Sequence, residues 1–233
     1  MAFYIKIASE VFRIEPLYGY IYEYCKGYYT DPADDAYDVS ADAADIDFER
    51  EHMDVLVPDK MLEALAVYRK ISEYLPAHGS FLFHGSAAAI DGKAYVFTAK
   101  SGVGKSTHAK LLRQTYKDRV VMINDDKPII TYRDGVAYAS GTPWNGKHRL
   151  STNITVPIKA ICFLSRGEQN HIERISPSDA FVGLLSQTYR PFSKDALKYT
   201  LQLLSGVSES VDFYRLACNM DPEAAEVSYN GMK

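Results

Sequence analysis

The stretch AYVFTAKSGVGKSTHAKLLRQTY, residues 94–116, decides the fold. It reads as a strand, a glycine-rich loop and a helix. Residues 99–107, AKSGVGKST, match a phosphate-binding P-loop of the Walker A type at every position but the first, where Ala99 replaces glycine. A loop between a strand and a helix points successive backbone N–H groups, and the positive end of the helix, at a phosphate group. The sequence therefore predicts a phosphate-binding loop at the end of a strand.

The residues of this loop have distinct predicted roles. Glycines 102 and 104 permit positive φ angles and a close approach of the backbone to phosphates. Lys105 can reach the β- and γ-phosphate oxygens, and the Ser106 hydroxyl can ligate Mg²⁺. His108, the second residue after Ser106, is expected to face solvent. The predicted nucleotide-binding residues of the loop are Ser101, Gly102, Val103, Gly104, Lys105, Ser106 and Thr107.

A pair of acids follows the next predicted strand, VVMI, as Asn124-Asp125-Asp126. Acids at the C-terminal end of a strand lie beside the ligand-binding edge in sheets of this kind. One such carboxylate can hold Mg²⁺, and a second can accept a proton from a hydroxyl group. Adjacent carboxylates raise each other's pKa unless a cation intervenes. A turn that begins at the two aspartates is the alternative interpretation.

Two further groups are candidates for the site. His84 stands 21 positions before Lys105, on an apolar strand expected to form a hairpin with the P-loop strand. A lone histidine there is more often a core residue than a catalytic one. Lys147, His148 and Arg149 follow Trp144 in a loop rich in Gly and Pro. They are candidates for a γ-phosphate clamp or a contact with the acceptor, with solvated surface charge as the alternative.

The remaining elements alternate between strands and helices. The tyrosine-rich first thirty residues favour strands over a helix, with turns near Pro16 and Gly27. Asp91-Gly92 favours a tight hairpin turn. The other expected elements are a helix over residues 58–75, apolar runs over 81–90 and 94–98, a hairpin over 128–140, a strand over 156–164, helices over 178–187 and 196–204, and a last strand followed by a helix with Asp221 as N-cap. This order indicates an α/β protein with additional antiparallel pieces.

Composition excludes several classes of protein. The chain has 233 residues, 47% of them apolar, and a formal charge of −4, which argues against non-specific binding of nucleic acid. No apolar run approaches the roughly 20 residues of a membrane span, and no signal peptide is recognisable, so a cytoplasmic protein is expected. Its three cysteines fit neither a disulfide framework nor a metal knuckle.

The charge is divided unevenly along the chain. Residues 31–54 hold ten acids and one base, whereas residues 93–174 hold 14 Lys and Arg against six acids. The acidic stretch lacks the glycine and terminal glutamate of an EF-hand loop and is expected to be a solvated face. The basic stretch, which contains the P-loop, suits a polyanionic ligand.

The chain resembles the HPr kinase/phosphorylase family and the wider group with the phosphoenolpyruvate-carboxykinase-like fold. The resemblance rests on His84-Gly85, the loop AKSGVGKST and Asp125-Asp126, in that order and at that spacing. It implies a P-loop mixed sheet flanked by helices, with His84, Lys105 and Asp126 in the active site. Asp126 would accept the proton of a seryl hydroxyl, and Ser106 with Asp125 would organise Mg²⁺.

Two departures from that family concern the substrate. Residues 144–149, WNGKHR, contain no acid where the family supplies a second magnesium-ligating glutamate. Residues 1–78, a tyrosine-rich and acidic β/α cap, replace the family's large N-terminal domain, and residues 79–233 form the expected P-loop catalytic domain. The chain is thus more similar to short stand-alone relatives, some of which occur beside modified-peptide clusters, and HPr itself is a doubtful substrate.

These observations lead to an expected function. It is an ATP- and Mg²⁺-dependent phosphotransferase that acts on a hydroxyl, most simply a serine, of a protein or peptide. A nucleotide-binding regulatory or accessory protein with little turnover, and a small-molecule kinase, are the alternatives. The expected partners are a nucleotide, an unidentified acceptor and, by resemblance, further copies of the chain, without nucleic acid or membrane. Nucleotide contacts are also expected from Lys147 and Arg149.

Overall fold

A computed structural model describes all 233 residues, and its N-terminal part is built around a small sheet. Strand β1 (Phe3–Ile7) pairs antiparallel with β2 (Glu10–Ile14), which pairs in parallel with β3 (Tyr37–Asp38). The alternating residues Phe3, Ile5 and Ile7 are buried, as the period of a strand requires. The helices of this part are α1 (Gly19–Tyr24), α2 (Ala43–Glu51) and α3 (Asp59–Tyr74), and a short 3₁₀ helix, η1 (Leu75–His78), follows.

Helix α1 corrects the expectation that the first thirty residues form only strands. The two strands β1 and β2 are confirmed, but residues 19–24 are helical. Ile21 is completely buried, and the rings of Tyr20 and Tyr24, four residues apart, lie 5.5 Å from each other. Tyr20, Ile21 and Tyr24 pack on the core that α1 shares with α3. This packing outweighs the preference of tyrosine for strands.

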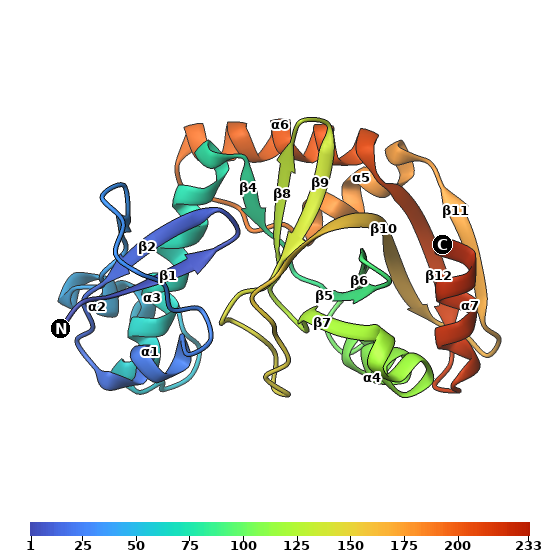
Figure 1. Ribbon diagram of the computed structural model, residues 1–233, viewed down its shortest axis with the longest axis horizontal. Coiled ribbons are helices and arrows are strands. Elements are labelled where there is room, and N and C mark those ends of the chain that lie inside the picture. Colours follow the sequence, from blue (N-terminus) through green and yellow to red (C-terminus); the bar gives the residue numbers. More distant parts are fainter.

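The rest of the chain forms a curled, mixed sheet of nine strands (Figure 1). Its central strand β10 pairs in parallel with β6 and β12, and every other pairing in this sheet is antiparallel. The order is β4-β8-β9-β10-β6-β5-β7, with β12 between β10 and β11. The strands are β4 (Ser80–Leu82), β5 (Ser86–Ile90), β6 (Lys93–Thr98), β7 (Val120–Asn124), β8 (Ile129–Arg133), β9 (Val136–Ser140), β10 (Thr155–Arg166), β11 (His171–Ile175) and β12 (Asp212–Cys218).

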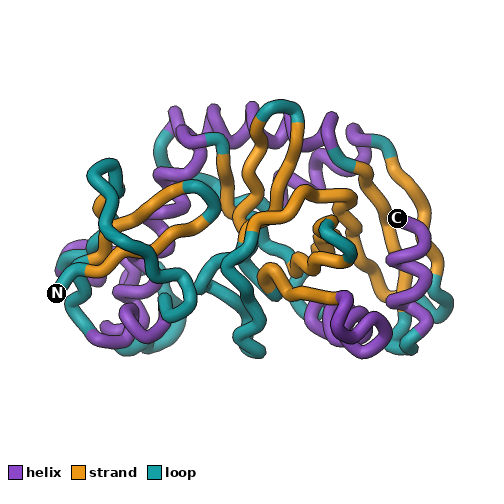
Figure 2. The backbone as a smooth tube through the Cα atoms, viewed as in Figure 1, coloured by secondary structure: helices purple, strands orange, loops and turns teal.

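Helices cover both faces of this sheet (Figures 1 and 2). Helices α5 (Pro177–Ser186) and α6 (Lys194–Ser210) pack on one face, and α4 (Lys105–Tyr116) and α7 (Glu223–Met232) pack on the other. Successive residues of β10 point to opposite cores, Ile161 toward α5 and α6 and Cys162 toward α4 and α7. A short 3₁₀ helix, η2 (Lys117–Arg119), joins α4 to β7. The expected α/β class with a mixed sheet is confirmed.

Several boundaries differ from the sequence prediction. The apolar run over residues 81–90 is two strands, because the chain leaves β4 at Phe83 and enters β5 at Ser86. The N-cap of α7 is Pro222 rather than Asp221, whose carboxylate accepts a hydrogen bond from the Asn219 amide instead. Strand β11 was not expected, and α6 continues to Ser210. No helix combines the length and the apolar character that crossing a bilayer requires.

Candidate functional site

The predicted phosphate-binding loop joins β6 to α4, as its sequence indicates. Gly102 and Gly104 have φ angles of 79° and 133°, a region that side-chain-bearing residues rarely adopt. Helix α4 begins at Lys105, whose ammonium group donates a hydrogen bond to the carbonyl of Ala99 at 2.9 Å. Lys105 is buried, and burial lowers its pKa, while the nearby Asp126 carboxylate opposes that shift. The hydrogen bond to Ala99 holds the ammonium group of Lys105 against the loop.

A pocket of about 550 Å³ opens beside this loop, and we call it the phosphate-loop pocket. Four bases and two carboxylates line it, so its surroundings favour an anion. Its volume is within the usual range for a small-molecule site. The lining residues are His84, Ser101, Gly102, Gly104, Lys105, Ser106, Thr107, Ala109, Lys110, Arg113, Asp125, Asp126, Lys147, His148 and Leu150.

Asp125, which directly follows β7, is almost completely buried in the wall of this pocket. Its Oδ1 accepts a hydrogen bond of 2.6 Å from the backbone N–H of Gly146, whereas its Oδ2 is buried without a partner. Burial raises the pKa of the Asp125 carboxyl above its ordinary value. Together with the Ser106 hydroxyl, the free oxygen offers the hard donors that Mg²⁺ prefers. No group of three or more His, Cys, Asp or Glu side chains is placed to hold a metal ion.

Asp126, the next residue, has a different environment. Its Oδ1 lies 3.2 Å from Nε2 of His84, and its Oδ2 lies 3.6 Å from Nζ of Lys127. Burial alone would raise the pKa of Asp126, but the hydrogen bond from His84 and the charges of Lys127 and Lys105 lower it below its ordinary value. Asp126 is therefore ionised at neutral pH, and it faces the same pocket as Lys105.

Asn124 holds the two aspartates in place, a role that sequence reasoning missed. Its side-chain oxygen accepts the backbone N–H groups of Asp126 and Lys127 at 2.8 and 2.6 Å. Its amide nitrogen donates to the backbone carbonyls of Thr142 and Trp144. The turn thus begins at Asn124, one residue before the expected alternative. Asparagine's preference for hydrogen bonding to nearby backbone is a signal that could have indicated it.

His84 was expected on a strand that forms a hairpin with the P-loop strand. It lies instead in the short connection between β4 and β5. Its backbone N–H donates to the carbonyl of Gln187 at 2.7 Å, and its carbonyl accepts from the Thr98 hydroxyl at 2.9 Å. The N–H of the following Gly85 donates to the carbonyl of Asp126 at 3.0 Å. A Cβ on Gly85 would stand 3.1 Å from the carbonyl oxygen of Phe97, so the chain approaches closely here. This backbone bridge brings His84 to Asp126.

The structure places two other residues away from their expected positions. Arg149 does not line the phosphate-loop pocket, although Lys147 and His148 do. Its φ angle of 51° lies in the left-handed region, and its side chain lines another pocket. His108 is 2% exposed, contrary to the expectation that it faces solvent. Its Nε2 lies 3.0 Å from Ser228 Oγ of α7, and because that hydroxyl donates to the carbonyl of Ala225, the ring N–H is the donor.

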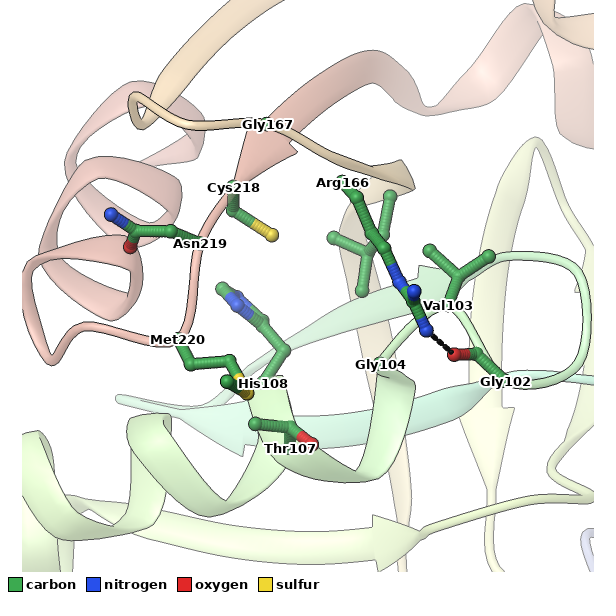
Figure 3. Close-up of a pocket in the computed structure, with 11 residues that line it drawn as sticks. Gly102, Val103, Gly104, Thr107, His108, Arg166, Gly167, Cys218, Asn219 and Met220 are labelled. Carbon is green, nitrogen blue, oxygen red and sulfur yellow. Dashed lines mark hydrogen bonds between the residues drawn. The ribbon is translucent and has the colours of Figure 1, made fainter.

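A second pocket of about 420 Å³ adjoins the loop on the side away from the aspartates, and we call it the apolar pocket (Figure 3). Gly102, Gly104 and Thr107 line both pockets. The Arg166 guanidinium donates to the carbonyl of Gly102 at 2.7 Å. The lining residues are Gly102, Val103, Gly104, Thr107, His108, Leu164, Arg166, Gly167, Cys218, Asn219 and Met220.

The residues of the apolar pocket that sequence reasoning missed come from the ends of two other strands. Arg166 ends β10, and Cys218, Asn219 and Met220 end and follow β12. Both strands run parallel to β6, so their carboxyl ends reach the same edge of the sheet as the P-loop. Ligands bind at this edge in open α/β sheets. Sequence reasoning missed these residues because it did not establish that β10 and β12 run parallel to β6.

A family model describes most of this region. The model for SynChlorMet cassette protein ScmC matches residues 47–198, more than half of the chain. The chain belongs to the ScmC family. The matched part of this ScmC-family protein includes the P-loop, His84 and both aspartates, and it ends before β12.

Two further comparisons accompany the ScmC assignment. No curated protein matches the chain. Among solved structures, the Hpr(Ser) kinase/phosphatase from Coxiella burnetii matches with 9% sequence identity and a TM-score of 0.37. That match covers 64% of the ScmC-family chain and 95% of the solved chain. A TM-score this low does not establish a common fold.

Proposed function

We propose that this ScmC-family protein is an ATP- and Mg²⁺-dependent phosphotransferase whose acceptor is a hydroxyl group, most simply a serine, of a protein or peptide. Residues 79–233 would form its P-loop catalytic domain of the phosphoenolpyruvate-carboxykinase-like class, and residues 1–78 a cap. One observation carries the proposal. An ionised carboxylate that is hydrogen-bonded to His84 faces the same pocket as the P-loop lysine.

The two adjoining pockets suit the two ends of a nucleotide. The phosphate-loop pocket supplies the backbone N–H groups at the start of α4 together with Lys105 and Lys147. The apolar pocket, which shares Gly102, Gly104 and Thr107 with it and is also lined by Val103 and Met220, has room for a base. In this arrangement the γ-phosphate lies on the side of Asp126, and the base lies on the side of β10 and β12.

The transfer step uses groups that this chain already holds in position. The acceptor oxygen forms a bond to the γ-phosphorus, the bond from that phosphorus to the bridging oxygen breaks, and ADP leaves. The proton of the acceptor hydroxyl passes to the Asp126 carboxylate, which His84 orients. Lys105 neutralises charge on the transferring group. When bound by Ser106 and the free Asp125 oxygen, Mg²⁺ would neutralise charge on the β- and γ-phosphates.

A nucleotide-binding accessory protein with little turnover is the second candidate. It is favoured by the segment 144–149, which contributes a backbone N–H to Asp125 but no carboxylate to the pocket. A protein of this kind would bind ATP through the same loop and transfer no phosphoryl group.

Asp126→Asn tests the proposal. With [γ-³²P]ATP and a panel of serine-containing peptides, we expect transfer to fall by roughly 10²- to 10⁴-fold, because the proton acceptor is lost. ATP affinity, measured by calorimetric titration, should stay within about twofold, since Lys105 and the loop remain. Asp134→Asn is the matched control, because Asp134 is exposed in the β8–β9 turn with a φ of 53° that asparagine tolerates.

Two outcomes would contradict this assignment. Equal loss of ATP affinity and transfer in Asp126→Asn would remove the proton-acceptor role. Tight ATP binding by the unmodified protein without transfer to any peptide, protein or small hydroxyl compound would favour the accessory protein.

A further inference from the structure

A third pocket, of about 410 Å³, lies where the N-terminal part meets the long loop between β9 and β10, and we call it the interface pocket. This loop descends between the two parts of the molecule (Figures 1 and 2). One side of the loop, with Lys147 and His148, lines the phosphate-loop pocket, and the other lines the interface pocket. The lining residues are Glu23, Tyr24, Lys26, Gly27, Tyr28, Pro143, Asn145, Arg149, Ser151, Thr152 and Asn153.

The interface pocket holds polar groups that the protein itself leaves unpaired. Lys26 and Arg149 take part in no ion pair. Tyr28 is 4% exposed, and its hydroxyl is closed off from solvent beside the Ser151 hydroxyl. With two bases and one acid, Glu23, the pocket favours an anion over a cation.

A left-handed turn places Arg149 in this pocket. Its φ of 51° is unfavourable for a residue with a side chain, and such strain concentrates at functional sites. The turn is closed by the N–H of Arg149, which donates to the carbonyl of Gly146 at 2.9 Å, and Gly146 in turn donates to Asp125. The same turn therefore positions Arg149 on one side of the loop and supports the phosphate-loop pocket on the other.

Tyr24 connects the interface pocket to the reacting carboxylate. Burial raises the pKa of Tyr24 to about 12, and the charges of Arg149 and Asp126 act on it in opposite directions. The Tyr24 ring also lies 6.3 Å from that of Trp144, whose carbonyl accepts a hydrogen bond from Asn124. Because Lys147 and Arg149 of the same loop line the two pockets, an acceptor that presents its hydroxyl to Asp126 has the interface pocket across this loop.

We propose that the interface pocket binds an acidic side chain of the acceptor peptide through Arg149 and Lys26. The planar guanidinium of Arg149 suits a carboxylate, which it can bind through two parallel hydrogen bonds. The nucleotide phosphates have their own pocket across the loop. This inference rests on the proposed function, because it assigns the acceptor's recognition site to the cap and the loop.

Two labelled peptides test the inference through binding alone. Both contain one serine, flanked by Asp and Glu in the first and by Asn and Gln in the second, and both have blocked ends. Fluorescence anisotropy should show that the full-length protein binds the acidic peptide at least about tenfold more tightly. Arg149→Gln should abolish this preference while leaving ATP affinity within about twofold. Arg133→Gln, on the exposed end of β8, should keep the preference.

A second variant guards against loss of the loop structure. Arg149→Lys keeps the charge and should retain part of the preference, and circular dichroism should show that both variants are folded. Equal binding of the two peptides, or a preference that survives Arg149→Gln, would overturn the inference. So would inorganic phosphate that displaces the acidic peptide at equal concentration, since the pocket would then be a phosphate site. Acidic preference without any phosphoryl transfer would instead contradict the proposed function and leave the pocket assignment standing.

Discussion

Asp125 and Asp126 are neighbours whose surroundings move their pKa values in opposite directions. Burial raises the pKa of Asp125, while the hydrogen bond from His84 and two nearby ammonium groups outweigh burial at Asp126 and lower its pKa. Pairs of titratable groups separated in this way often divide roles at an active site. Here the separation leaves Asp126 ready to accept a hydrogen bond from a hydroxyl and leaves Asp125 with an oxygen that lacks a partner.

His108 should make folding sensitive to acid. Its Nε2–H donates to Ser228 Oγ, its Nδ1 is buried without a partner, and burial lowers its pKa to about 4. The unfolded state, with an ordinary pKa of about 6.5, therefore binds a proton first as the pH falls. The stability held above about pH 6.5 is lost progressively down to about pH 4, by about 3 kcal/mol.

His108→Gln should remove this part of the acid sensitivity, since its side-chain amide can still donate to Ser228. The free energy of unfolding in urea, measured at about pH 7 and about pH 4, should fall less in the variant than in the unmodified protein. Identical losses in both proteins would show that His108 is not the group responsible.

At the scale of elements, the prediction was most accurate where short-range signals act. The Asp91-Gly92 turn adopts φ angles of 51° and 76°, as its hairpin requires, and the helix over residues 59–74 forms where its apolar period indicates. Helix α1 and strand β11 were missed. Helix α1 depends on packing against the core shared with α3, and β11 is an exposed edge strand defined by its pairing with β12. Neither dependence is visible in a local pattern.

Some residues of the candidate site could likewise be predicted from a local motif, and others could not. The loop residues and the aspartates are recognisable because a motif carries them. Arg149 was predicted, with Lys147 and His148, to contact the γ-phosphate or the acceptor, and a left-handed turn places it on the opposite side of the loop from those two residues. Arg166 and Asn219 reach the P-loop only because β10 and β12 run parallel to β6. Such placements follow from long-range strand pairing.

Helix α6 allows a test in which packing opposes intrinsic propensity. A Cβ on Gly206 would lie 2.3 Å from the ring of Tyr132, which belongs to β8. Gly206→Ala should therefore lower the free energy of unfolding by about 1–3 kcal/mol, although alanine is the better helix former by about 1 kcal/mol. Gly19→Ala in α1, where nothing lies within 4 Å of the added Cβ, should be neutral or slightly stabilising. Chemical denaturation measures both, and an unchanged Gly206→Ala protein would refute the packing of α6 on β8.

At the scale of the whole molecule, the two parts share one core. Trp144, from the β9–β10 loop, is buried among residues of the N-terminal part, and its indole N–H donates to the carbonyl of Ala64 in α3 at 3.0 Å. Leu82 and Ile129, from the large sheet, belong to the same cluster. The N-terminal part is thus bound to the part with the large sheet through apolar contact as well as through the chain.

This shared core predicts that the molecule unfolds in one transition. Trp144 is the only tryptophan, so its fluorescence reports on the contact between the two parts, whereas far-ultraviolet circular dichroism reports on all helices. The two signals should give the same midpoint in urea. A fluorescence transition that precedes the loss of helix would show that the parts separate before they unfold.

We propose that residues 99–107 bind the phosphates of a nucleotide, and calorimetric titration with ATP and Mg²⁺ measures this binding. The unmodified protein should bind with a one-to-one stoichiometry, and Lys105→Ala should weaken binding by at least about tenfold, because the loss of a charge-assisted hydrogen bond costs about 1.5–3 kcal/mol. Lys198→Ala, at an exposed position of α6, should bind like the unmodified protein. Absence of binding by the unmodified protein, or equal binding by Lys105→Ala, would contradict the account.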